Sequence, residues 1–382
     1  MKIRSAIFSV SILFTWVNVG AESAFSVFEI YVAPDGTDDS IGSFAAPTSL
    51  PSAIARIAPG GYIYLRGGTY RYSDPIKIER GNNGAPSAIK HLFAYSDEVP
   101  ILNFAEQRIE TSLKGLLVRG NYWHIKGVIV ERASDNGIYI SGSHNIIERV
   151  VTRYNGDTGL QLGRAKSSDT TSLWPSYNLI VSSESHDNKD LTGENADGFA
   201  AKLTSGPGNV FRYDIAHHNA DDGWDLFTRP ETGSIGAVTI EDSIAYENGV
   251  LSDGTRMPEG DRNGFKLGGR DIAVDHVIRR NLAYNNGQHG FTYNRNLGAI
   301  LMMSNLAINN TERNFNFSAG KSVFSGNTSC NGQNAYKDKT LGIDGGGNAW
   351  WNGENGVNCP SDEHTAFSWW INADGSLGYK FD

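Results

Sequence analysis

Four aspartates and one lysine in the middle third of the sequence have the types and spacing to do chemistry together. They are Asp197, Asp221, Asp222, Asp225 and Lys266. Carboxylates gathered in one place repel one another and raise one another's pKa unless positive charge neutralises them. A hard divalent cation meets that need, and Ca²⁺ takes about six to eight oxygen ligands in irregular geometry. We therefore predict a divalent cation site, best suited to Ca²⁺, at the four aspartates, with the ammonium of the lysine beside it.

Other interpretations of the same residues are open. Aspartates in turns are often only solvated, and Lys266 would then form a surface ion pair that adds little stability. A zinc site is disfavoured because the chain has only two cysteines, and because His217 and His218 are adjacent rather than at the helical spacing of zinc motifs.

The aspartates and the lysine interrupt a repeat that must position them. In each repeat a Gly is followed by a large apolar residue, which should point into a core. Because strand side chains alternate, the next residue should point outward and face solvent. This outward column reads Gln161, Ala200, Asp225, Lys266 and Thr292, and the residues before each Gly read Thr158, Asp197, Asp222, Asn263 and His289. The register predicts Asp197 and Asp222 on adjacent coils, with Lys266 one coil beyond Asp225.

Asparagines mark a turn of the same repeat. A column of buried Asn side chains can satisfy its amides between neighbouring coils, whereas a single Asn is common in any turn. The candidate ladder contains Asn155, Asn188, Asn219, Asn248, Asn286, Asn310 and Asn331, each after a short strand-like run. Their uneven spacing argues against propeller blades and leucine-rich repeats. It favours a right-handed parallel β-helix, in which coils stack about 4.8 Å apart.

The fold class predicted for the whole chain is all-β, a single-domain solenoid of this kind with an N-terminal capping helix. Gly is 44 of 382 residues, Pro is only 12, and no long 3.6-residue period is present. A short helix at about Pro51–Ile57 should cover the open end of the stack, where apolar side chains would otherwise be exposed. The repeat is lost after about residue 335, and we interpret 336–382 as a C-terminal tail that covers the solenoid.

The first 21 residues have the features of a secretory signal peptide, which leaves residues 22–382 as the mature domain. Lys2 and Arg4 precede an apolar stretch from Ala6 to Val17, and small residues follow. That stretch is too short to cross a bilayer, so we expect a secreted protein with no membrane anchor. In an oxidising compartment Cys330 and Cys359 are expected to pair and hold the tail, with two free thiols as the alternative.

The charge balance limits the partners. A formal net charge of −9 opposes binding to nucleic acid or to anionic membranes. An acidic polysaccharide remains a candidate partner if a cation mediates the contact locally. We expect the protein to act on it as a monomer.

Three motifs resemble the polysaccharide lyases of family nine, the group that contains pectate lyase L. They are NADGFAAKL at 195–203, NADDGWDLF at 219–227 and NGFKLGG at 263–269, and the opening segment 31–70 is similar as well. The resemblance covers roughly residues 28–335. It implies a right-handed β-helix that cleaves pectate by β-elimination. In that family pattern Ca²⁺ is held by Asp197, Asp221, Asp222 and Asp225, and Lys266 is the base. Lys202, which lies close to Asp197 in the sequence, is a second candidate for the base.

This chemistry agrees with the residue types. Eliminating across a 4-linked uronate requires removal of the C5 proton, and a cation on the neighbouring carboxylate would stabilise the charge that develops. The amine must be unprotonated, so we expect an alkaline optimum and loss of activity with a chelator. Arg229, Arg270 and Arg295 are candidates for binding substrate carboxylates, or are ordinary turn residues. The groove is expected to be open at both ends and to allow internal cutting.

Other function classes are kept as alternatives. A polygalacturonase-like glycoside hydrolase would use paired carboxylates and needs no metal; Asp221, Asp222 and His289 superficially fit such a site. A lyase for another acidic polysaccharide, such as rhamnogalacturonan, has the same requirements as a pectate lyase. A non-catalytic glycan-binding solenoid would bind without turnover, and the fold alone does not decide between binding and catalysis.

Overall fold

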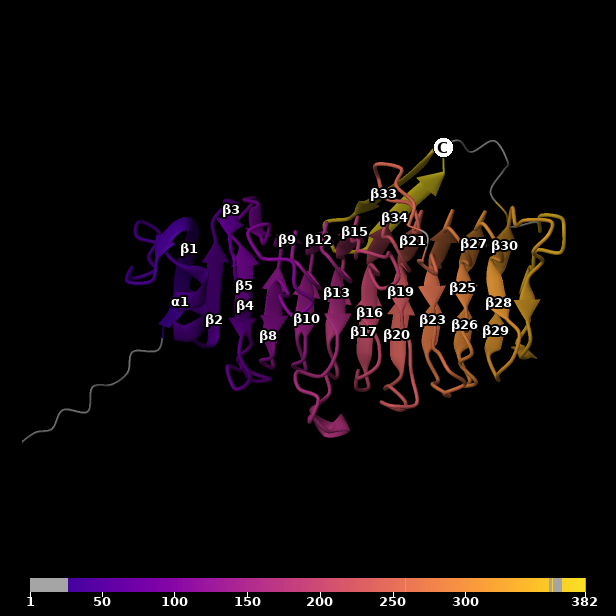
Figure 1. The fold of residues 1–382 in the computed structure, drawn as a ribbon, viewed down its shortest axis with the longest axis horizontal. Helices are drawn as coiled ribbons and strands as arrows, with labels where there is room; N and C mark the ends of the chain where they lie inside the picture. The colour runs from indigo at the N-terminus through magenta and orange to yellow at the C-terminus, as the bar shows by residue number, and fades with distance from the viewer. Residues whose placement is uncertain (1–26, 258, 357–358, 360–365, 382) are drawn as a thin grey trace, which may run out of the picture.

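The computed structural model describes residues 27–381 except residue 258, residues 357–358 and residues 360–365. The predicted signal peptide, residues 1–21, lies outside the described residues. The described chain is an elongated parallel β-helix, with its first strands at one end and the last coils at the other (Figure 1). No helix in the described part of the chain is long and apolar enough to span a membrane.

Three parallel sheets, named A, B and C here, run along the solenoid, and from β2 onward every third strand belongs to the same sheet. Sheet A contains β1 (Val27–Thr37), β2 (Ile57–Leu65), β5 (Lys90–Ala94), β8 (Trp123–Lys126), β11 (Ile146–Glu148), β14 (Leu179–Val181), β17 (Asn209–Arg212), β20 (Val238–Glu241), β23 (Val277–Arg279), β26 (Leu301–Met303), β29 (Val323–Ser325) and β32 (Ile343–Asp344). Sheet B contains β3 (Gly68–Arg71), β6 (Pro100–Asn103), β9 (Ile129–Glu131), β12 (Val151–Arg153), β15 (Glu184–His186), β18 (Ile215–His217), β21 (Ile244–Tyr246), β24 (Leu282–Tyr284), β27 (Leu306–Ile308) and β30 (Thr328–Cys330). Sheet C contains β4 (Ile76–Ile78), β7 (Leu116–Val118), β10 (Ile138–Ile140), β13 (Leu160–Leu162), β16 (Phe199–Ala201), β19 (Trp224–Asp225), β22 (Phe265–Lys266), β25 (Phe291–Thr292), β28 (Phe315–Phe317) and β31 (Lys339–Thr340).

The core of the solenoid contains the apolar column that the repeat predicts. Aromatic rings on consecutive coils of sheet C stack at centroid distances of 4.7–5.1 Å. The stacked residues are Phe199, Trp224, Phe265, Phe291 and Phe315, and all are buried. Such offset aromatic pairs add stabilisation beyond their buried area, so this column fixes the spacing of the coils that carry the site.

The predicted asparagine ladder is confirmed from Asn155 to Asn310, but its last member is wrong. Each amide donates to the side-chain oxygen on the next coil, at 2.8 Å from Asn155 to Asn188 and at 2.9 Å from Asn286 to Asn310. Asn310 then donates to Asn314 at 2.7 Å. Asn331 is part-exposed and pairs with Asn355 instead. The ladder therefore ends because a closer amide satisfies Asn310.

A second ladder, which the repeat analysis missed, follows sheet A. Asn281 donates to Asn305 at 3.1 Å, Asn305 to Asn327 at 3.0 Å and Asn327 to Asn348 at 3.0 Å. Earlier coils carry other polar residues in this turn, for example Ser183. Because residue types vary along the column, no single letter marks it in the sequence.

The N-terminal end is closed by helix α1 (Leu50–Arg56), within one residue of the predicted segment. The Ser49 hydroxyl accepts the backbone N–H of Ser52, and Pro51 occupies the first turn, where its missing N–H costs nothing. Leu50, Ala53 and Ile54 are buried. The helix therefore covers apolar surface at the first coils. A short 3-10 helix, η1 (Thr171–Leu173), lies in the loop after β13.

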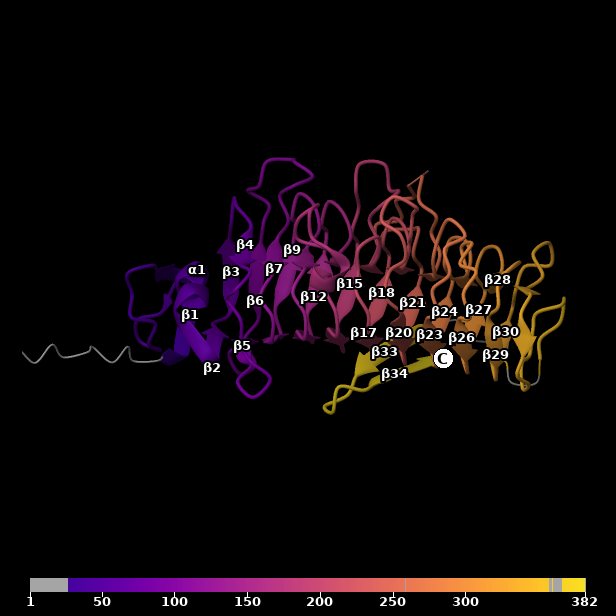
Figure 2. The same cartoon turned by 90° about the horizontal axis from the view of Figure 1, so that it is seen from below.

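The C-terminal segment lies along the side of the solenoid. Strands β31 and β32 still extend sheets C and A, and then an antiparallel hairpin of β33 (Phe367–Ile371) and β34 (Leu377–Phe381) runs beside sheet B (Figures 1 and 2). Phe367 packs against the rings of Tyr246 and Tyr284. The sulfur atoms of Cys330 and Cys359 are bonded, which ties this segment to the end of β30.

Candidate active site

The strand register places the site residues as the repeat predicts. Ala200 pairs with Asp225, Asp225 with Lys266 and Lys266 with Thr292 across β16, β19, β22 and β25. The whole outward column of sheet C is therefore confirmed. Lys266 lies one coil beyond Asp225 on the same face.

The column before each Gly is also confirmed, and it is held by side-chain to backbone hydrogen bonds. The N–H of Asp222 donates to Asp197 Oδ1 at 3.3 Å, and the N–H of Asn263 donates to Asp222 Oδ1 at 2.7 Å. The N–H of His289 then donates to Asn263 Oδ1 at 3.2 Å. Asp197 and Asp222 thus each use Oδ1 to join the next coil, while Asp197 Oδ2 accepts hydrogen bonds from Thr158 and Lys202.

One detail of the sequence prediction is wrong: the outward column is not exposed to solvent. Asp225 is 3% and Lys266 8% exposed. Alternation gives the direction of a side chain, but loops decide whether water reaches it. Two long loops, 187–198 before β16 and 247–264 before β22, supply residues such as Glu194 and Glu259 to the wall of a cavity that Asp225 and Lys266 also line. The site is therefore at the bottom of a cleft.

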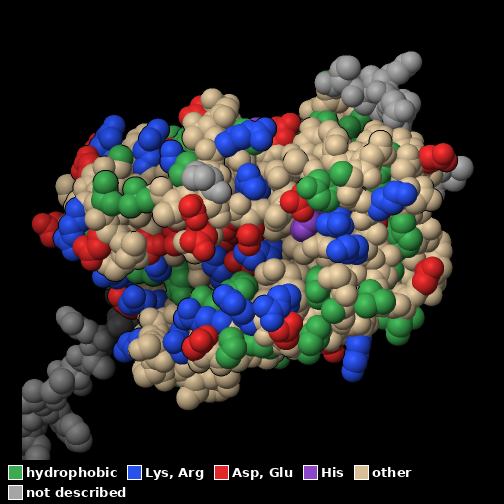
Figure 3. All heavy atoms as spheres, turned by 45° about the vertical axis from the view of Figure 1, so that its right-hand side comes forward, with side chains coloured by type: hydrophobic (Ala, Val, Ile, Leu, Met, Phe, Trp, Pro, Cys, Tyr) green, Lys and Arg blue, Asp and Glu red, His purple; other side chains and the backbone are tan. Residues whose placement is uncertain are grey.

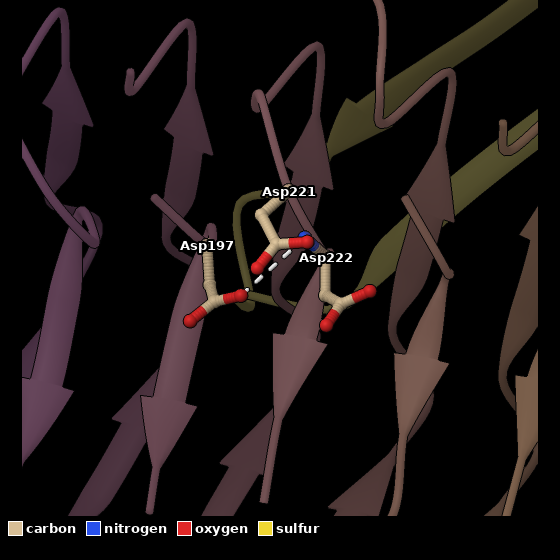
Figure 4. A group of neighbouring side chains, drawn as sticks. All are labelled: Asp197, Asp221 and Asp222. Carbon is tan, nitrogen blue, oxygen red and sulfur yellow. Dashed lines mark hydrogen bonds between the residues drawn. The ribbon is translucent and has the colours of Figure 1, made fainter. Parts of the chain in front are cut away.

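Three of the four predicted metal ligands come together. One oxygen from each of Asp197, Asp221 and Asp222 lies within 4.8 Å of the others, and all three residues are buried. Figure 4 shows Asp197 on one coil and the other two on the next, with their carboxylates converging. Asp222 Oδ2 is buried and accepts no hydrogen bond among the described residues. A buried carboxylate oxygen without a donor is costly, so this atom is suited to a cation.

Asp225 lies outside this group of three and contacts the two lysines instead. Its Oδ2 is 3.2 Å from Lys202 Nζ and 3.9 Å from Lys266 Nζ, and its Oδ1 accepts the N–H of Phe227. Lys202 Nζ also donates to Asp197 Oδ2 at 2.6 Å. Lys202, the second candidate base, is therefore an integral part of the same charge cluster.

Lys266 is surrounded by carboxylates. Its Nζ is 3.1 Å from Asp222 Oδ2, although it is not aimed at that oxygen as a hydrogen-bond donor. It is also 2.8 Å from Asp261 Oδ2, and Asp261 is the exposed member of the cluster. The repeat gave no signal for Asp261, because it lies in the irregular loop before β22.

Burial makes the aspartates hold protons more tightly than usual. Burial raises the pKa of Asp197 to about 7, although Lys202 opposes the shift. Burial also raises the pKa of Asp222 to about 8, opposed by Lys266. The pKa of Asp221 is raised well above its ordinary value by burial and then by Asp222 and Asp197. The two lysines do not supply enough positive charge to ionise all of these groups at neutral pH.

The pKa of Lys266 shifts in the opposite sense to what a base requires. Burial lowers it, but the carboxylates of Asp222 and Asp225 outweigh burial and raise it well above its ordinary value. Lys202 behaves in the same way, with Asp197 as the main carboxylate. Either amine would therefore need further positive charge on the carboxylates before it could lose its proton at moderate pH.

A cavity of about 430 Å³ opens over the cluster. Both lysines and Asp225 line it, as do all three arginines that the sequence suggested: Arg229, Arg270 and Arg295. Arg295 is paired with Asp271, and Arg270 lies over the ring of Phe227. On one face of the molecule, a band of acidic side chains is bordered by Lys and Arg side chains (Figure 3). Cations in the cavity wall suit an anionic ligand.

The oxygen ligands of the converging carboxylates fit the metal that the sequence suggests. All the converging side chains offer carboxylate oxygens, which are hard ligands, and no His or Cys joins the group among the described residues. Asp197 and Asp222 each use Oδ1 for the backbone of the next coil; Asp222 Oδ2 accepts no hydrogen bond among the described residues, and Asp197 Oδ2 is shared with Lys202. These features fit Ca²⁺ and disfavour zinc.

Comparison with known proteins agrees with the fold and the site. The model of the Pel9A-like, right handed beta helix region matches residues 30–334. The chain is 48% identical over 343 residues to pectate lyase L of Paenibacillus polymyxa (strain SC2). The aligned region covers 89% of this chain and 76% of that protein. It is 42% identical over 321 residues to pectate lyase L of Thermoclostridium stercorarium, covering 82% of this chain but 25% of that longer protein.

A solved structure is similar over most of its length. The crystal structure of pectate lyase Pel9A superposes with a TM-score of 0.74 and 31% sequence identity, covering 88% of this chain and 83% of that one. The fold and these matches define a right-handed parallel β-helix polysaccharide lyase. The chain belongs to polysaccharide lyase family nine, in its pectate lyase L-like group.

Proposed function

We propose that this enzyme is a secreted, calcium-dependent pectate lyase that cuts polygalacturonate internally by β-elimination and releases 4,5-unsaturated oligogalacturonides. The observation that carries the proposal is the position of a lysine amine, Lys266 Nζ, at the floor of a cationic cavity and 3.1 Å from the donor-free oxygen of Asp222. The names of the similar proteins supply the substrate class.

Asp197, Asp221 and Asp222 would hold Ca²⁺, and Asp225 would complete the ligand set by turning from the lysines. When bound, Ca²⁺ would supply positive charge next to the uronate carboxylate and stabilise the negative charge that develops there. Sharing these carboxylates with a cation weakens their pull on the Lys266 proton, which lowers its pKa towards the working pH.

Lys266 would act as the base. Its Nζ lies in the cavity wall, where it would accept the C5 proton of the uronate. The electron pair of that C–H bond forms the C4–C5 double bond, and the bond from C4 to the glycosidic oxygen breaks with its electron pair on that oxygen, which takes a proton from solvent. Lys202 would remain the counter-ion of Asp197, since its 2.6 Å contact with Asp197 Oδ2 holds its proton in place.

The substrate chain would lie along sheet C. A second, polar cavity of about 330 Å³ shares Asp261, Asn294 and Arg295 with the first and continues towards β28. Arg229, Arg270 and Arg295 would bind carboxylates of successive uronates. Binding over several coils supports internal cutting of a long chain. Secretion rests on the predicted signal peptide and agrees with the Cys330–Cys359 bond.

The proposal is tested by incubating the purified protein with polygalacturonate in the presence of calcium or of a chelator. We expect ultraviolet-absorbing unsaturated ends, a broad range of oligomer sizes early in the reaction, and no product with chelator. Saturated reducing ends formed without calcium would instead identify a hydrolase. Calcium-dependent binding without any product would identify a glycan-binding protein.

A further inference from the structure

The polar cavity beside the catalytic cleft lies on the coils that follow Lys266. Its volume is about 330 Å³, within the range of roughly 300–1,000 Å³ typical of ligand sites. Thr292, which pairs in register with Lys266, lines it, and so does Asn316 one coil further on. Asp261, whose carboxylate is 2.8 Å from Lys266 Nζ, lines both this cavity and the cleft. A chain held at Lys266 would therefore place a neighbouring sugar unit in the polar cavity.

The cleft and the polar cavity differ in charge. The cleft is lined by five cations, two lysines and three arginines, and by four carboxylates. Among the described residues that line the polar cavity, Arg295 is the one Lys or Arg and Asp261 is the one carboxylate. Neither charge is free, because Arg295 pairs with Asp271 and Asp261 pairs with Lys266. The polar cavity therefore offers no uncompensated positive charge to a carboxylate of the substrate.

His289, which also lines the polar cavity, adds no positive charge to it. The side chain is buried, and its Nδ1 accepts the N–H of Arg313 at 3.2 Å. Burial, and then Arg313, lowers the pKa of His289 to about 4. Glu312 lies 3.5 Å from its Nε2. The imidazole is therefore uncharged at neutral and alkaline pH, where the enzyme is expected to work.

The lining of the polar cavity keeps hydrogen-bonding capacity for a ligand. Asn294 Nδ2 donates to the Gly268 carbonyl at 2.8 Å, and its Oδ1 has no partner among the described residues. The side-chain amide of Gln288 has no partner among them either. Thr292 Oγ1 accepts the N–H of Asn294 at 3.3 Å. Amides and hydroxyls both donate and accept, as sugar hydroxyls do, whereas a carboxylate only accepts.

A carboxylate on the ligand would also meet a like charge in the polar cavity. The Asp261 carboxylate lies at the boundary with the cleft, where a unit next to the cut uronate must pass. Like charges brought together at a binding site oppose binding. The Asp261 side chain is 54% exposed, so solvent screens this repulsion. We therefore expect a preference against a charged unit and not an absolute exclusion.

We propose that the polar cavity is a subsite for an uncharged sugar unit of the substrate, either a methyl-esterified galacturonate or a neutral sugar. The inference rests on the proposed function, because the chain must be cut at a uronate held beside Lys266. The unit that follows this uronate towards β28 would be preferred without a free carboxylate. The enzyme would then cut partly esterified chains, or chains interrupted by neutral sugars, in preference to a fully ionised run.

The first test maps the products that the full chain forms from partly methyl-esterified polygalacturonate at saturating calcium. Tandem mass spectrometry locates each methyl ester relative to the new chain end. We expect esters at one fixed position within two units of the cut to be enriched about three- to five-fold over their average frequency, the effect of one screened charge. Esters spread evenly around the cut, or depleted at every position near it, would overturn the proposal.

Gln288→Lys tests the cavity itself. It adds an ammonium to the lining and removes no side-chain hydrogen bond among the described residues. The ester enrichment should be lost, and the ratio of kcat/KM for fully de-esterified over partly esterified polymer should rise about five-fold. Gln333→Lys adds the same charge at an exposed position that lines neither cavity, and should keep the parent's product map. Identical maps for the two variants would contradict the assignment.

A second polymer separates the two sources of the uncharged unit. Unsaturated products from rhamnogalacturonan, in which uronates alternate with a neutral sugar, would identify a neutral sugar as the occupant. Ester-enriched ends without any product from rhamnogalacturonan would identify the methyl ester. Unsaturated ends with evenly spread esters and no product from rhamnogalacturonan would overturn this inference alone. No unsaturated product from any of the polymers would contradict the proposed function, and this inference with it.

Discussion

At the scale of single residues, the site contains more carboxylates than its two lysines can neutralise. Asp197 and Asp222 have pKa values of about 7 and 8, so the folded chain binds protons more tightly than the unfolded chain, whose Asp groups titrate near ~3.9. Stability contributed by such raised groups is greatest at low pH and falls as pH rises from about 4 to 8. We therefore expect a chelator-treated sample to melt at progressively lower temperature between pH 5 and pH 8.

Calcium should reverse that loss. An ion held by the folded state alone adds about 2.7 kcal/mol when its concentration is a hundred times its Kd. Melting curves at pH 8 with calcium and with chelator should therefore differ clearly, and those at pH 5 much less, because protons then compete for the same oxygens. Magnesium at the same concentration is the control. A melting temperature independent of calcium at pH 8 would contradict a metal site at these aspartates.

Substituting Asp261 should change the pKa of Lys266, the proposed base. Its carboxylate is 2.8 Å from Lys266 Nζ and is one of the groups that raise the pKa of Lys266. Asp261→Asn should therefore shift the alkaline rise of kcat against pH to lower pH. The shift should be under about one unit, because the Asp261 side chain is 54% exposed and its charge is screened. Asp253→Asn, in the same loop but away from the amine, is the control and should leave the profile in place.

The sequence predicted the residues of this site because they are chemically unusual within a repeat. A carboxylate or ammonium in the columns of Asp197, Asp225 or Lys266 can be placed by register alone. Asp261 could not be found in this way, because its loop follows no period. The register placed Asp225 beside Lys266, but the pair that Asp225 also forms with Lys202 depends on side-chain rotamers and could not be predicted.

At the scale of structural elements, amide ladders hold the coils that carry the site. Asn219 is fully buried, donates to Asn248 and to the Ser185 carbonyl, and accepts from Asn188. Asn219→Ala should lower the free energy of unfolding by about 1–3 kcal/mol, because partners on both neighbouring coils lose a buried hydrogen bond. Asn331→Ala, at the part-exposed position that the ladder does not include, should cost clearly less. Similar losses in chemical denaturation for both variants would argue against the ladder as a source of stability.

The two ladders also show why the fold could be predicted only in part from the sequence. Seven turns with the same residue type made one ladder visible, and only its last member was misassigned, where Asn314 replaces Asn331. The other ladder mixes Ser, Asp and Asn, so its function as a hydrogen-bonded column is visible only once the coils are stacked. Burial of the outward column likewise depends on loop length, which strand alternation does not report.

At the scale of the whole molecule, the C-terminal hairpin is a long-range attachment to sheet B. It packs on Tyr246 and Tyr284, Trp369 donates to the Tyr246 hydroxyl, and the Cys330–Cys359 bond closes a segment of 29 residues. Replacing both cysteines by Ala should destabilise this attachment by about 3 kcal/mol. Proteolysis should then remove the hairpin before the solenoid unfolds, whereas the parent should resist cleavage there. Equal protease resistance of the two proteins would show that the bond adds nothing to the attachment.

The central claim is that Lys266 takes a proton from a uronate next to calcium held by the buried aspartates. The most direct measurement is the initial rate of unsaturated product formation from polygalacturonate at saturating calcium, for the parent and for Lys266→Ala, with Lys321→Ala as control. Loss of a catalytic base should lower the rate by about 10²- to 10⁴-fold without altering the circular dichroism spectrum, and the control should keep the parent's rate. A folded Lys266→Ala protein with a near-normal rate would contradict the account.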